Sequence, residues 1–208
     1  MPIIIPLNQT TDLSRALEFL NKGEIIAFPT DTVYGIGVLL GSSAGIQKLY
    51  HSKARSPLKA IAVLIGGMDQ LPQVVNTLPT AARKLAERYW PGALTLVLPK
   101  QDNLPENISP YPTIGVRMPD HPIILDLLKI TGPLATTSAN LSGGKDPVTA
   151  REVLEQLGEK IGFLFDGGKT AGGIPSTVVD CTQSPPVILR QGAISAQEIF
   201  KVILNDEN

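Results

Sequence analysis

Short runs of β-branched and other apolar residues alternate with segments of helical periodicity along almost the whole chain. Side chains repeat every two residues on a strand and about every 3.6 on a helix, so this alternation predicts a sheet with helices packed around it. The expected fold class is therefore α/β, or mixed α+β. We expect strands at residues 3–5, 25–28, 61–65, 94–98, 114–116, 134–136, 163–165, 177–180 and 187–189.

Helix starts are marked by capping signals. Thr149 with Glu152, and Ser195 with Glu198, have the spacing of a capping box, in which each side chain bonds the backbone N–H of the other residue. Pro122 suits the first turn of a helix that runs to about residue 130, because proline lacks only an N–H that a first turn leaves unpaired.

Length and composition limit the possible classes of protein. The 208 residues allow one large domain or two small ones, and since no segment has the composition of a linker, we expect one domain over residues 1–208. A hydrophobic content of 43% with only 18% charged residues excludes a disordered chain. The net charge of -1 argues against a strong, sequence-independent nucleic-acid binder.

The chain has one cysteine, Cys181, and two histidines, His51 and His121. These cannot form an intrachain disulfide or a usual zinc cluster. The N-terminus has no basic region before an apolar core, and the apolar stretch at 60–65 is far shorter than the roughly 18 residues of a membrane span. We therefore expect a cytoplasmic location and no membrane partner.

Four segments next to predicted strands could carry chemistry. The first, at 28–37, has the sequence F-P-T-D-T-V-Y-G-I-G and is predicted to leave a strand and enter a loop rich in hydroxyls. A turn capped by Asp31 is an equally good interpretation. The glycines do not form a dinucleotide fingerprint, because the third glycine would fall on Leu40.

The second segment, at 53–59, places three cations within seven residues: Lys53, Arg55 and Lys59. Pro57 is expected to end the preceding helix, so that the cations lie on a bend and can converge on a polyanion. The alternative is a solvated basic helix end, which complements the helix dipole.

The third segment, at 113–122, places Arg117 after an apolar strand, where it could clamp a carboxylate or phosphate; the alternative is a surface ion pair with Asp120. The fourth, at 135–144, is a strand end followed by four hydroxyls, an amide and two glycines, a donor-rich loop that suits phosphate oxygens; the alternative is a plain polar loop. Ser176 at a strand start and Arg190 at a strand end complete the candidates.

Other catalytic classes lack support. Residues 167–170 read G-G-K-T, but the first glycine of a P-loop would fall on Phe163. The segments contain no close carboxylate pair, and the few histidines and single cysteine do not favour a hydrolytic triad. What remains is a set of cations, hydroxyls and backbone donors, which suits phosphoryl or nucleotidyl transfer.

Taken in order, these motifs resemble the YrdC family of L-threonylcarbamoyladenylate synthases. The resemblance runs from about residue 5 to about residue 194. It rests on F-P-T-D-T-V-Y-G-I-G, K-A-R, R-Y-W-P-G-A-L-T-L-V-L, G-V-R-M-P-D-H-P, T-S-A-N-L-S-G, S-T-V-V-D and R-Q-G. It implies an open, twisted sheet with flanking helices, curled around a large concave cavity.

The resemblance also implies an activity. L-Threonine, bicarbonate and ATP would give threonylcarbamoyl-AMP and pyrophosphate, for the modification of adenosine 37 in tRNA. Mg²⁺ would enter with the ATP phosphates, with no metal ligand from the protein. A separate tRNA threonylcarbamoyl transferase complex would receive the product.

Site residues follow position by position from the resemblance. Lys53 and Arg55 would be catalytic. The L-threonine site would contain Thr30, Arg117, Thr136 and Ser176. The ATP site would contain Lys53, Arg55, Lys59, Thr113, Ser138, Asn140, Asp146 and Arg190. Leu64 departs from the family, because a histidine often stands there.

Two alternatives remain open at this point. A non-catalytic protein could use a basic concave face to bind double-stranded RNA or an rRNA precursor, although the low net charge and few aromatic residues weaken this hypothesis. A carbamoyl-adenylate-forming enzyme with a different acceptor is the second, and the pair of Arg117 and Thr30 argues against it by favouring an amino-acid carboxylate.

Overall fold

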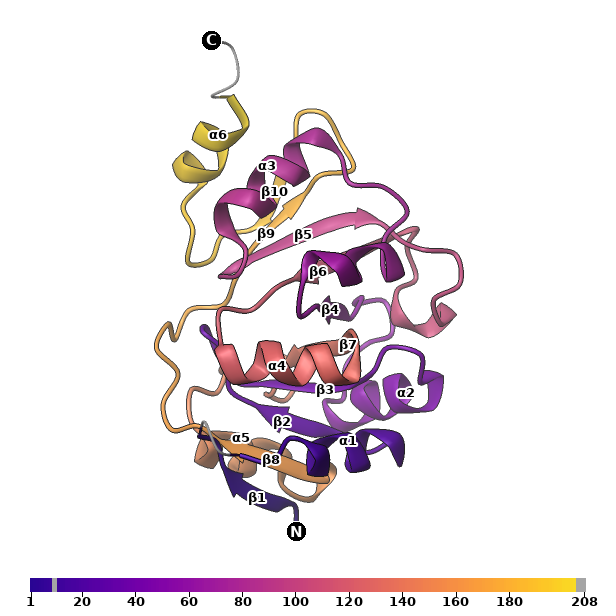
Figure 1. Cartoon of the computed structure of the whole chain (residues 1–208), viewed down its shortest axis with the longest axis vertical. Coiled ribbons are helices and arrows are strands. Elements are labelled where there is room, and N and C mark those ends of the chain that lie inside the picture. Colours follow the sequence, from indigo (N-terminus) through magenta and orange to yellow (C-terminus); the bar gives the residue numbers. More distant parts are fainter. Residues whose placement is uncertain (9–10, 205–208) are drawn as a thin grey trace.

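Figure 1 shows the computed structural model of the chain, which describes residues 1–8 and 11–204. Its strands are β1 (Ile3–Pro6), β2 (Ile26–Phe28), β3 (Gly35–Leu39), β4 (Ala62–Leu64), β5 (Leu94–Pro99), β6 (Thr113–Arg117), β7 (Leu134–Ser138), β8 (Phe163–Asp166), β9 (Thr177–Asp180) and β10 (Val187–Arg190). Its α-helices are α1 (Ser14–Asn21), α2 (Ser43–Ser52), α3 (Thr80–Tyr89), α4 (Pro122–Thr131), α5 (Ala150–Leu157) and α6 (Ala196–Leu204). Short 3₁₀ helices lie at η1 (Met68–Gln73), η2 (Glu106–Ile108) and η3 (Gly158–Lys160).

The strands that the structure describes form one mixed, 10-stranded sheet in the order β1-β8-β2-β3-β7-β4-β6-β5-β9-β10. In its middle, β7 pairs antiparallel with both β3 and β4, and β4 pairs parallel with β6. The sheet is open, because β1 and β10 each pair with one neighbour only. This arrangement confirms the expected fold class of a mixed sheet with flanking helices.

Every strand expected from the sequence is present, but one strand was missed. The segment from Gly35 was expected to be a loop, whereas it forms β3 and pairs with β2 and β7. Its glycines allow close packing: a Cβ atom on Gly37 would lie 3.1 Å from Thr136 Oγ1 and 3.2 Å from a ring carbon of Phe28. Glycines therefore belong to the strand here, although they usually weaken a strand prediction.

The helix starts agree with the capping signals. Helix α4 begins at Pro122, as expected. Helix α5 has the complete capping box of Thr149 and Glu152, and the Glu198 carboxylate accepts from the backbone N–H of Ser195 at 2.9 Å while the Ser195 hydroxyl accepts from the N–H of Glu198 at 3.3 Å. Both capping boxes are confirmed.

The expected role of Pro57 is wrong. Helix α2 ends at Ser52, five residues before this proline. The chain turns instead at Ala54, whose φ of 49° lies in the left-handed region that a helix cannot continue through. The three cations therefore lie on a bend, as expected, but the backbone of Ala54 makes it.

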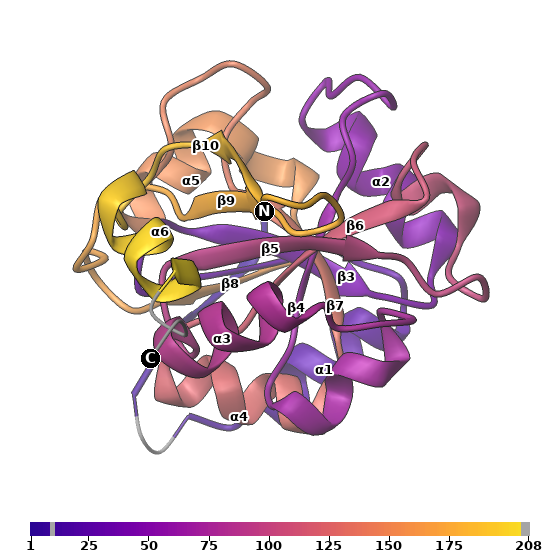
Figure 2. The same ribbon diagram turned by 90° about the horizontal axis from the view of Figure 1, so that it is seen from above.

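Alternate residues of β8 face opposite layers of helices. Phe163 and Phe165 of β8 pack in one apolar cluster with residues of α1 and α4, whereas Leu164 lies in a second cluster with residues of α2 and α5. Figure 2 shows α4 and α5 on opposite sides of the sheet. This two-sided core explains why residues 163–165 of β8 form a continuous apolar run in the sequence.

One domain over residues 1–208 stays a prediction, and residues 9–10 and 205–208 of that range lie outside the described residues. None of the helices in the described ranges is long and apolar enough to cross a membrane.

The effect of shortening a leucine side chain on the stability of the protein should depend on how deeply that leucine is buried. Leu96 of β5 is completely buried, whereas Leu189 of β10 is 57% exposed. Leu96→Ala should lower the free energy of unfolding by about 2–5 kcal/mol, since the deleted carbons leave a cavity. Leu189→Ala, the matched control, should change it by less than about 1 kcal/mol. Urea denaturation followed by circular dichroism checks both values, and equal losses would contradict this assignment of the core.

Candidate active-site cavity

A cavity of about 310 Å³ lies against the middle of the sheet. Its floor is a sheet face, because alternate residues of neighbouring strands line it: Ala62 and Leu64 of β4, Thr95 and Val97 of β5, Gly115 and Arg117 of β6, and Thr136 and Ser138 of β7. The residues between them on β4, β5 and β6, Val63, Leu96 and Val116, lie in the core and are fully buried, as is Ala135 just before Thr136, whereas Thr137 of β7 also lines the cavity. One strand pattern thus builds both the core and the site.

The first polar group at the cavity surrounds Arg117, the last residue of β6, which is only 7% exposed. Its guanidinium donates from Nε to the carbonyl of Gly92 at 2.9 Å and from Nη1 to Thr32 Oγ1 at 2.8 Å. Nη2 donates to the Asp31 carboxylate, which forms an ion pair with it. Burial lowers the pKa of Arg117, and the Asp31 carboxylate opposes this shift. The ion pair therefore favours a charged guanidinium at a position that is nearly shielded from water.

This geometry decides between the alternatives left open for two residues. Arg117 pairs with Asp31 and not with Asp120, which is exposed. The Asp31 carboxylate bonds a distant arginine, so its main contact is not the cap of its own turn. The two segments, 86 positions apart at these residues, meet at one end of the cavity.

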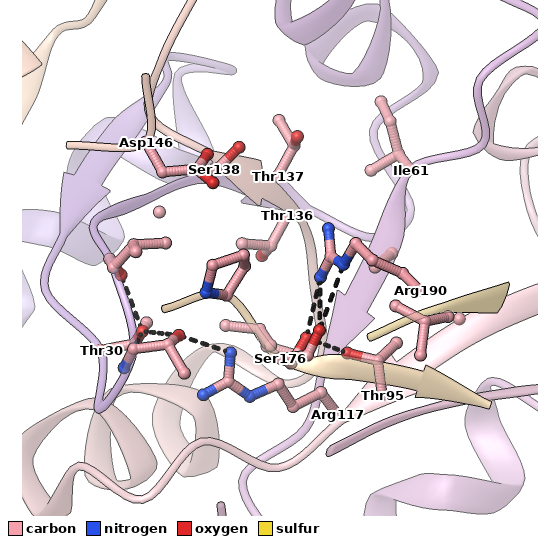
Figure 3. Close-up of a pocket in the computed structure, with 18 of the residues that line it drawn as sticks. Thr30, Ile61, Thr95, Arg117, Thr136, Thr137, Ser138, Asp146, Ser176 and Arg190 are labelled. Carbon is pink, nitrogen blue, oxygen red and sulfur yellow. Dashed lines mark hydrogen bonds between the residues drawn. The ribbon is translucent and has the colours of Figure 1, made fainter. Parts of the chain in front are cut away.

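A second polar group joins β5, β9 and β10. Arg190 donates to the carbonyl of Ser176 at 2.8 Å and to its hydroxyl at 3.2 Å. The Ser176 hydroxyl also lies 2.7 Å from Thr95 Oγ1. Figure 3 shows Arg190 and Arg117 approaching the cavity from different strands, with Ser176 between Arg190 and the floor. Burial lowers the pKa of Arg190 and the Asp146 carboxylate opposes this shift.

A third polar group organises the T-S-A-N segment, which contains the last two residues of β7 and the start of the loop that follows; we call it the T-S-A-N loop. The ammonium of Lys53 is 1% exposed and donates to the carbonyls of Ser138 and Asn140. It also donates to Asn140 Oδ1 at 2.9 Å, while the Ser138 hydroxyl donates to the same oxygen at 2.6 Å. The Asn140 amide donates onward to the carbonyl of Gly144 at 2.7 Å. Lys53 therefore holds this loop in place, with neutral oxygens as its acceptors.

Most of the predicted site residues lie around one cavity. Those that line it are Thr30, Arg55, Arg117, Thr136, Ser138, Asp146, Ser176 and Arg190. Figure 3 shows Thr30 and Arg117 together at one end and Ser138 with Asp146 at the other. The remaining four are not among its lining residues: Lys53, Lys59, Thr113 and Asn140.

These four residues differ in their surroundings. Lys53 and Asn140 are buried behind the loop that they hold, Thr113 is a half-buried residue at the start of β6, and Lys59 is exposed. The carbonyls of Lys59 and Ala60 accept hydrogen bonds from Arg55, at 3.1 Å and 2.8 Å. Arg55 is thus the member of the cation cluster that faces the cavity, and the alternative of a solvated helix end does not describe Lys53.

Two buried threonines of the site were missed as candidates, Thr32 and Thr95. Both line the cavity and bond groups that were predicted. Thr95 is a polar residue between two leucines of a strand, and the alternation of strand faces could have identified it. Thr32 carries no such signal, because its partner Arg117 is 85 positions away.

Leu64, at a position where a histidine often stands in the YrdC family, also lies at the cavity. It is nearly buried, pairs in register with Arg117 and packs in the cluster with α4. The cavity wall next to Arg117 is therefore apolar at this position.

Comparison with known proteins identifies the family. Residues 18–192 match the model of the Sua5, YciO and YrdC family, which carries the description "telomere recombination". The chain belongs to this family. The YrdC-type resemblance of the sequence motifs is confirmed, together with the fold that it implied.

Two relatives of the Sua5, YciO and YrdC family carry an enzyme name. The chain is 39% identical to threonylcarbamoyl-AMP synthase of Pyrococcus abyssi (strain GE5 / Orsay), covering 98% of this chain and 61% of that protein. It is 40% identical to threonylcarbamoyl-AMP synthase of Bacillus subtilis (strain 168), covering 92% of this chain and 56% of that protein. The chain thus spans a little more than half the length of these relatives.

A solved family structure has nearly the same fold. The crystal structure of P. abyssi Sua5 complexed with L-threonine superposes with a TM-score of 0.93 at 39% identity, covering 97% of this chain and 61% of that chain. Within the Sua5, YciO and YrdC family, the RNA-binding alternative is not favoured, since these relatives are named as synthases.

The burial of Lys53 predicts a pH-dependent stability. Burial, together with the nearby Arg55, lowers the pKa of Lys53 from 10.5 to about 7, and Asp146 opposes this shift. The unfolded chain therefore holds this proton more tightly between pH 7 and 10.5, so stability should rise with pH across that window. From pH 7 to 9 the free energy of unfolding should rise by about 1–2 kcal/mol relative to that of Lys53→Met.

Chemical denaturation at pH 7, 8 and 9 measures this difference. Lys59→Met removes an exposed cation of the same cluster and should follow the unmodified protein at each pH. Parallel pH profiles for the unmodified protein and Lys53→Met would contradict the assignment.

Proposed function

We propose that this chain is a threonylcarbamoyl-AMP synthase, a nucleotidyltransferase that acts on L-threonine, bicarbonate and ATP. The observation that carries the proposal is one cavity with two different polar ends. At one end a nearly buried arginine, Arg117, has N–H donors left over. At the other, Ser138 and Asp146 line the cavity together with a second cation, Arg55. The names of the relatives and the L-threonine in the P. abyssi Sua5 structure support the same assignment.

The L-threonine end uses a fixed guanidinium. Three of the five N–H donors of Arg117 are used by Gly92, Thr32 and Asp31, which leaves two for a carboxylate. The Thr136 and Ser176 hydroxyls line the same cavity and would contact the amine or hydroxyl of the amino acid. A clamp whose orientation is set before binding loses little entropy when the substrate arrives.

The ATP end would bind the phosphate groups through positively charged side chains. Arg55 and Arg190, which both line the cavity, would neutralise phosphate oxygens. Lys53 would act through the loop that it holds. In the described part of the chain, no three His, Cys, Asp or Glu side chains are grouped to hold a metal. Asp146 supplies a single carboxylate to the described lining, a donor set that fits Mg²⁺ carried in by the triphosphate.

The proposed reaction balances as follows. The threonine amine attacks the carbon derived from bicarbonate, which forms a C–N bond and releases water. A carbamate oxygen then attacks the α-phosphorus, the bond from that phosphorus to the bridging oxygen breaks, and pyrophosphate leaves. Negative charge grows on the leaving group, where Arg55, Arg190 and the metal ion would stabilise it. A cavity on the sheet face would also shield the carbamate from water.

The wider cellular role is part of the same proposal. We expect a cytoplasmic enzyme whose product passes to a tRNA threonylcarbamoyl transferase complex. Such a transfer would complete the modification of adenosine 37.

The test is the formation of threonylcarbamoyl-AMP and pyrophosphate by the purified protein, with each substrate omitted in turn. Arg117→Lys keeps the charge but loses the planar fork, so the KM for L-threonine should rise roughly 10- to 100-fold while that for ATP changes less than about twofold. Arg151→Lys, on an exposed side chain of α5, is the matched control and should change neither.

Two results would overturn the proposal. One is the absence of any product with all substrates present. The other is product formation that does not depend on L-threonine, which would point to a different acceptor of the carbamoyl group.

A further inference from the structure

We infer that Thr32 is a positioning residue which orients Arg117 for L-threonine, and that Thr30 makes no hydrogen bond to the substrate. The inference rests on the proposed function, because it concerns the L-threonine end of the same cavity. The inference goes beyond the proposed function because it gives Thr32 a role and changes the role that the family resemblance implied for Thr30.

The hydrogen-bond chain at this end has only one possible direction. Arg117 can only donate, so Thr32 Oγ1 accepts from its Nη1 at 2.8 Å. The Thr30 hydroxyl gives its proton to the carbonyl of Val33 at 2.7 Å. The two threonine hydroxyls lie 3.0 Å apart, so the proton between them must come from Thr32.

This direction fills the hydrogen-bonding capacity of Thr30. A hydroxyl has one proton to donate and two lone pairs that accept. Thr30 Oγ1 donates to Val33 and accepts from both the hydroxyl and the backbone N–H of Thr32, the latter at 3.2 Å. No donor or acceptor is left for a ligand. Thr30 lines the cavity and can contact a substrate only through its methyl group or its backbone.

Thr32 supplies the one side-chain hydroxyl that fixes the Nη1 end of the guanidinium in the described structure. Gly92 holds Nε and Asp31 holds Nη2, and neither of these contacts involves Nη1. Thr32 is 2% exposed, so water cannot readily take its place if the hydroxyl is removed. Without it, the guanidinium can rotate, and its free N–H groups no longer point in one direction.

The loop that carries Thr32 is itself fixed. The carbonyl of Asp31 accepts from the N–H of Gly172 at 3.0 Å, and that of Thr32 from Gly173 at 2.8 Å. A Cβ atom on Gly172 would lie 2.6 Å from the Asp31 carbonyl oxygen, so glycine permits this close approach. The position of Thr32 is thus set by the backbone and does not depend on a bound substrate.

The experiment measures the affinity for L-threonine directly, by isothermal titration calorimetry, beside the KM values for L-threonine and ATP. Thr32→Val keeps the shape and removes the hydroxyl, so Kd and KM for L-threonine should rise about tenfold, with the KM for ATP within about twofold. Thr32→Ser restores the hydroxyl and should return both to within about threefold of the original values.

Thr170→Val is the matched control. Thr170 is buried near the same loop, and its hydroxyl has no hydrogen-bond partner among the described residues. The substitution removes the same atom as Thr32→Val and should leave the affinity for L-threonine unchanged. Circular dichroism at 25 °C would verify that each variant is folded before binding is measured.

A double-mutant cycle tests the role of Thr30. If Thr30 acts only through Thr32 and Arg117, the Kd of the Thr30→Val, Thr32→Val double variant should equal that of the weaker-binding single variant. Effects that multiply would show that Thr30 contacts the amino acid independently, and would overturn its assigned role. An unchanged Kd in Thr32→Val would overturn the role of Thr32.

The two proposals fail in different ways. A protein that binds L-threonine, loses affinity in Thr32→Val and forms no threonylcarbamoyl-AMP would refute the synthase activity and support the positioning role. A protein that forms the product while Thr32→Val binds normally would do the reverse. A protein that neither binds L-threonine nor forms product would refute both.

Discussion

The buried guanidinium of Arg117 ties together the parts of the chain that make the cavity. It joins the end of β6 to the loop between β2 and β3 through Thr32 and Asp31, and to the segment before β5 through the carbonyl of Gly92. A charge removed from water is costly unless it is paired and hydrogen-bonded, and here three groups meet that requirement. The same contacts that make the burial tolerable also orient the remaining N–H donors toward the cavity.

A second buried cation organises the other end of the cavity in a different way. Lys53 bonds two carbonyls and an amide oxygen of the T-S-A-N loop, without a carboxylate partner. These acceptors are neutral, so they bring no negative charge to this end of the cavity, where the cation Arg55 also lies. The two buried cations therefore differ in their partners: Arg117 is paired with the Asp31 carboxylate, whereas Lys53 is hydrogen-bonded to neutral protein oxygens.

The position of the site on a sheet face has consequences for what sequence reasoning could find. The sequence predicted a site built from loops, since its polar motifs follow strands. The loops do contribute, but Thr95, Thr136, Ser138 and Arg117 belong to strands, and their neighbours in the chain form the core. Polar residues that interrupt an apolar strand therefore marked the site. The strand from Gly35 was missed because glycines usually weaken a strand prediction, although here they allow close packing against Phe28 and Thr136.

The sequence by itself determined the nature of the elements and the chemistry of the site. Local periodicity and capping placed every strand but one, and the ordered motifs indicated the family, because these signals depend on residues close together in the chain. Only the tertiary structure decided which groups meet. That Lys53 holds Asn140, and that Thr32 and Asp31 hold Arg117, follows from sheet pairing across more than 80 positions, which local patterns do not encode. Contacts over that distance decide which cations face the cavity and which are buried to shape it.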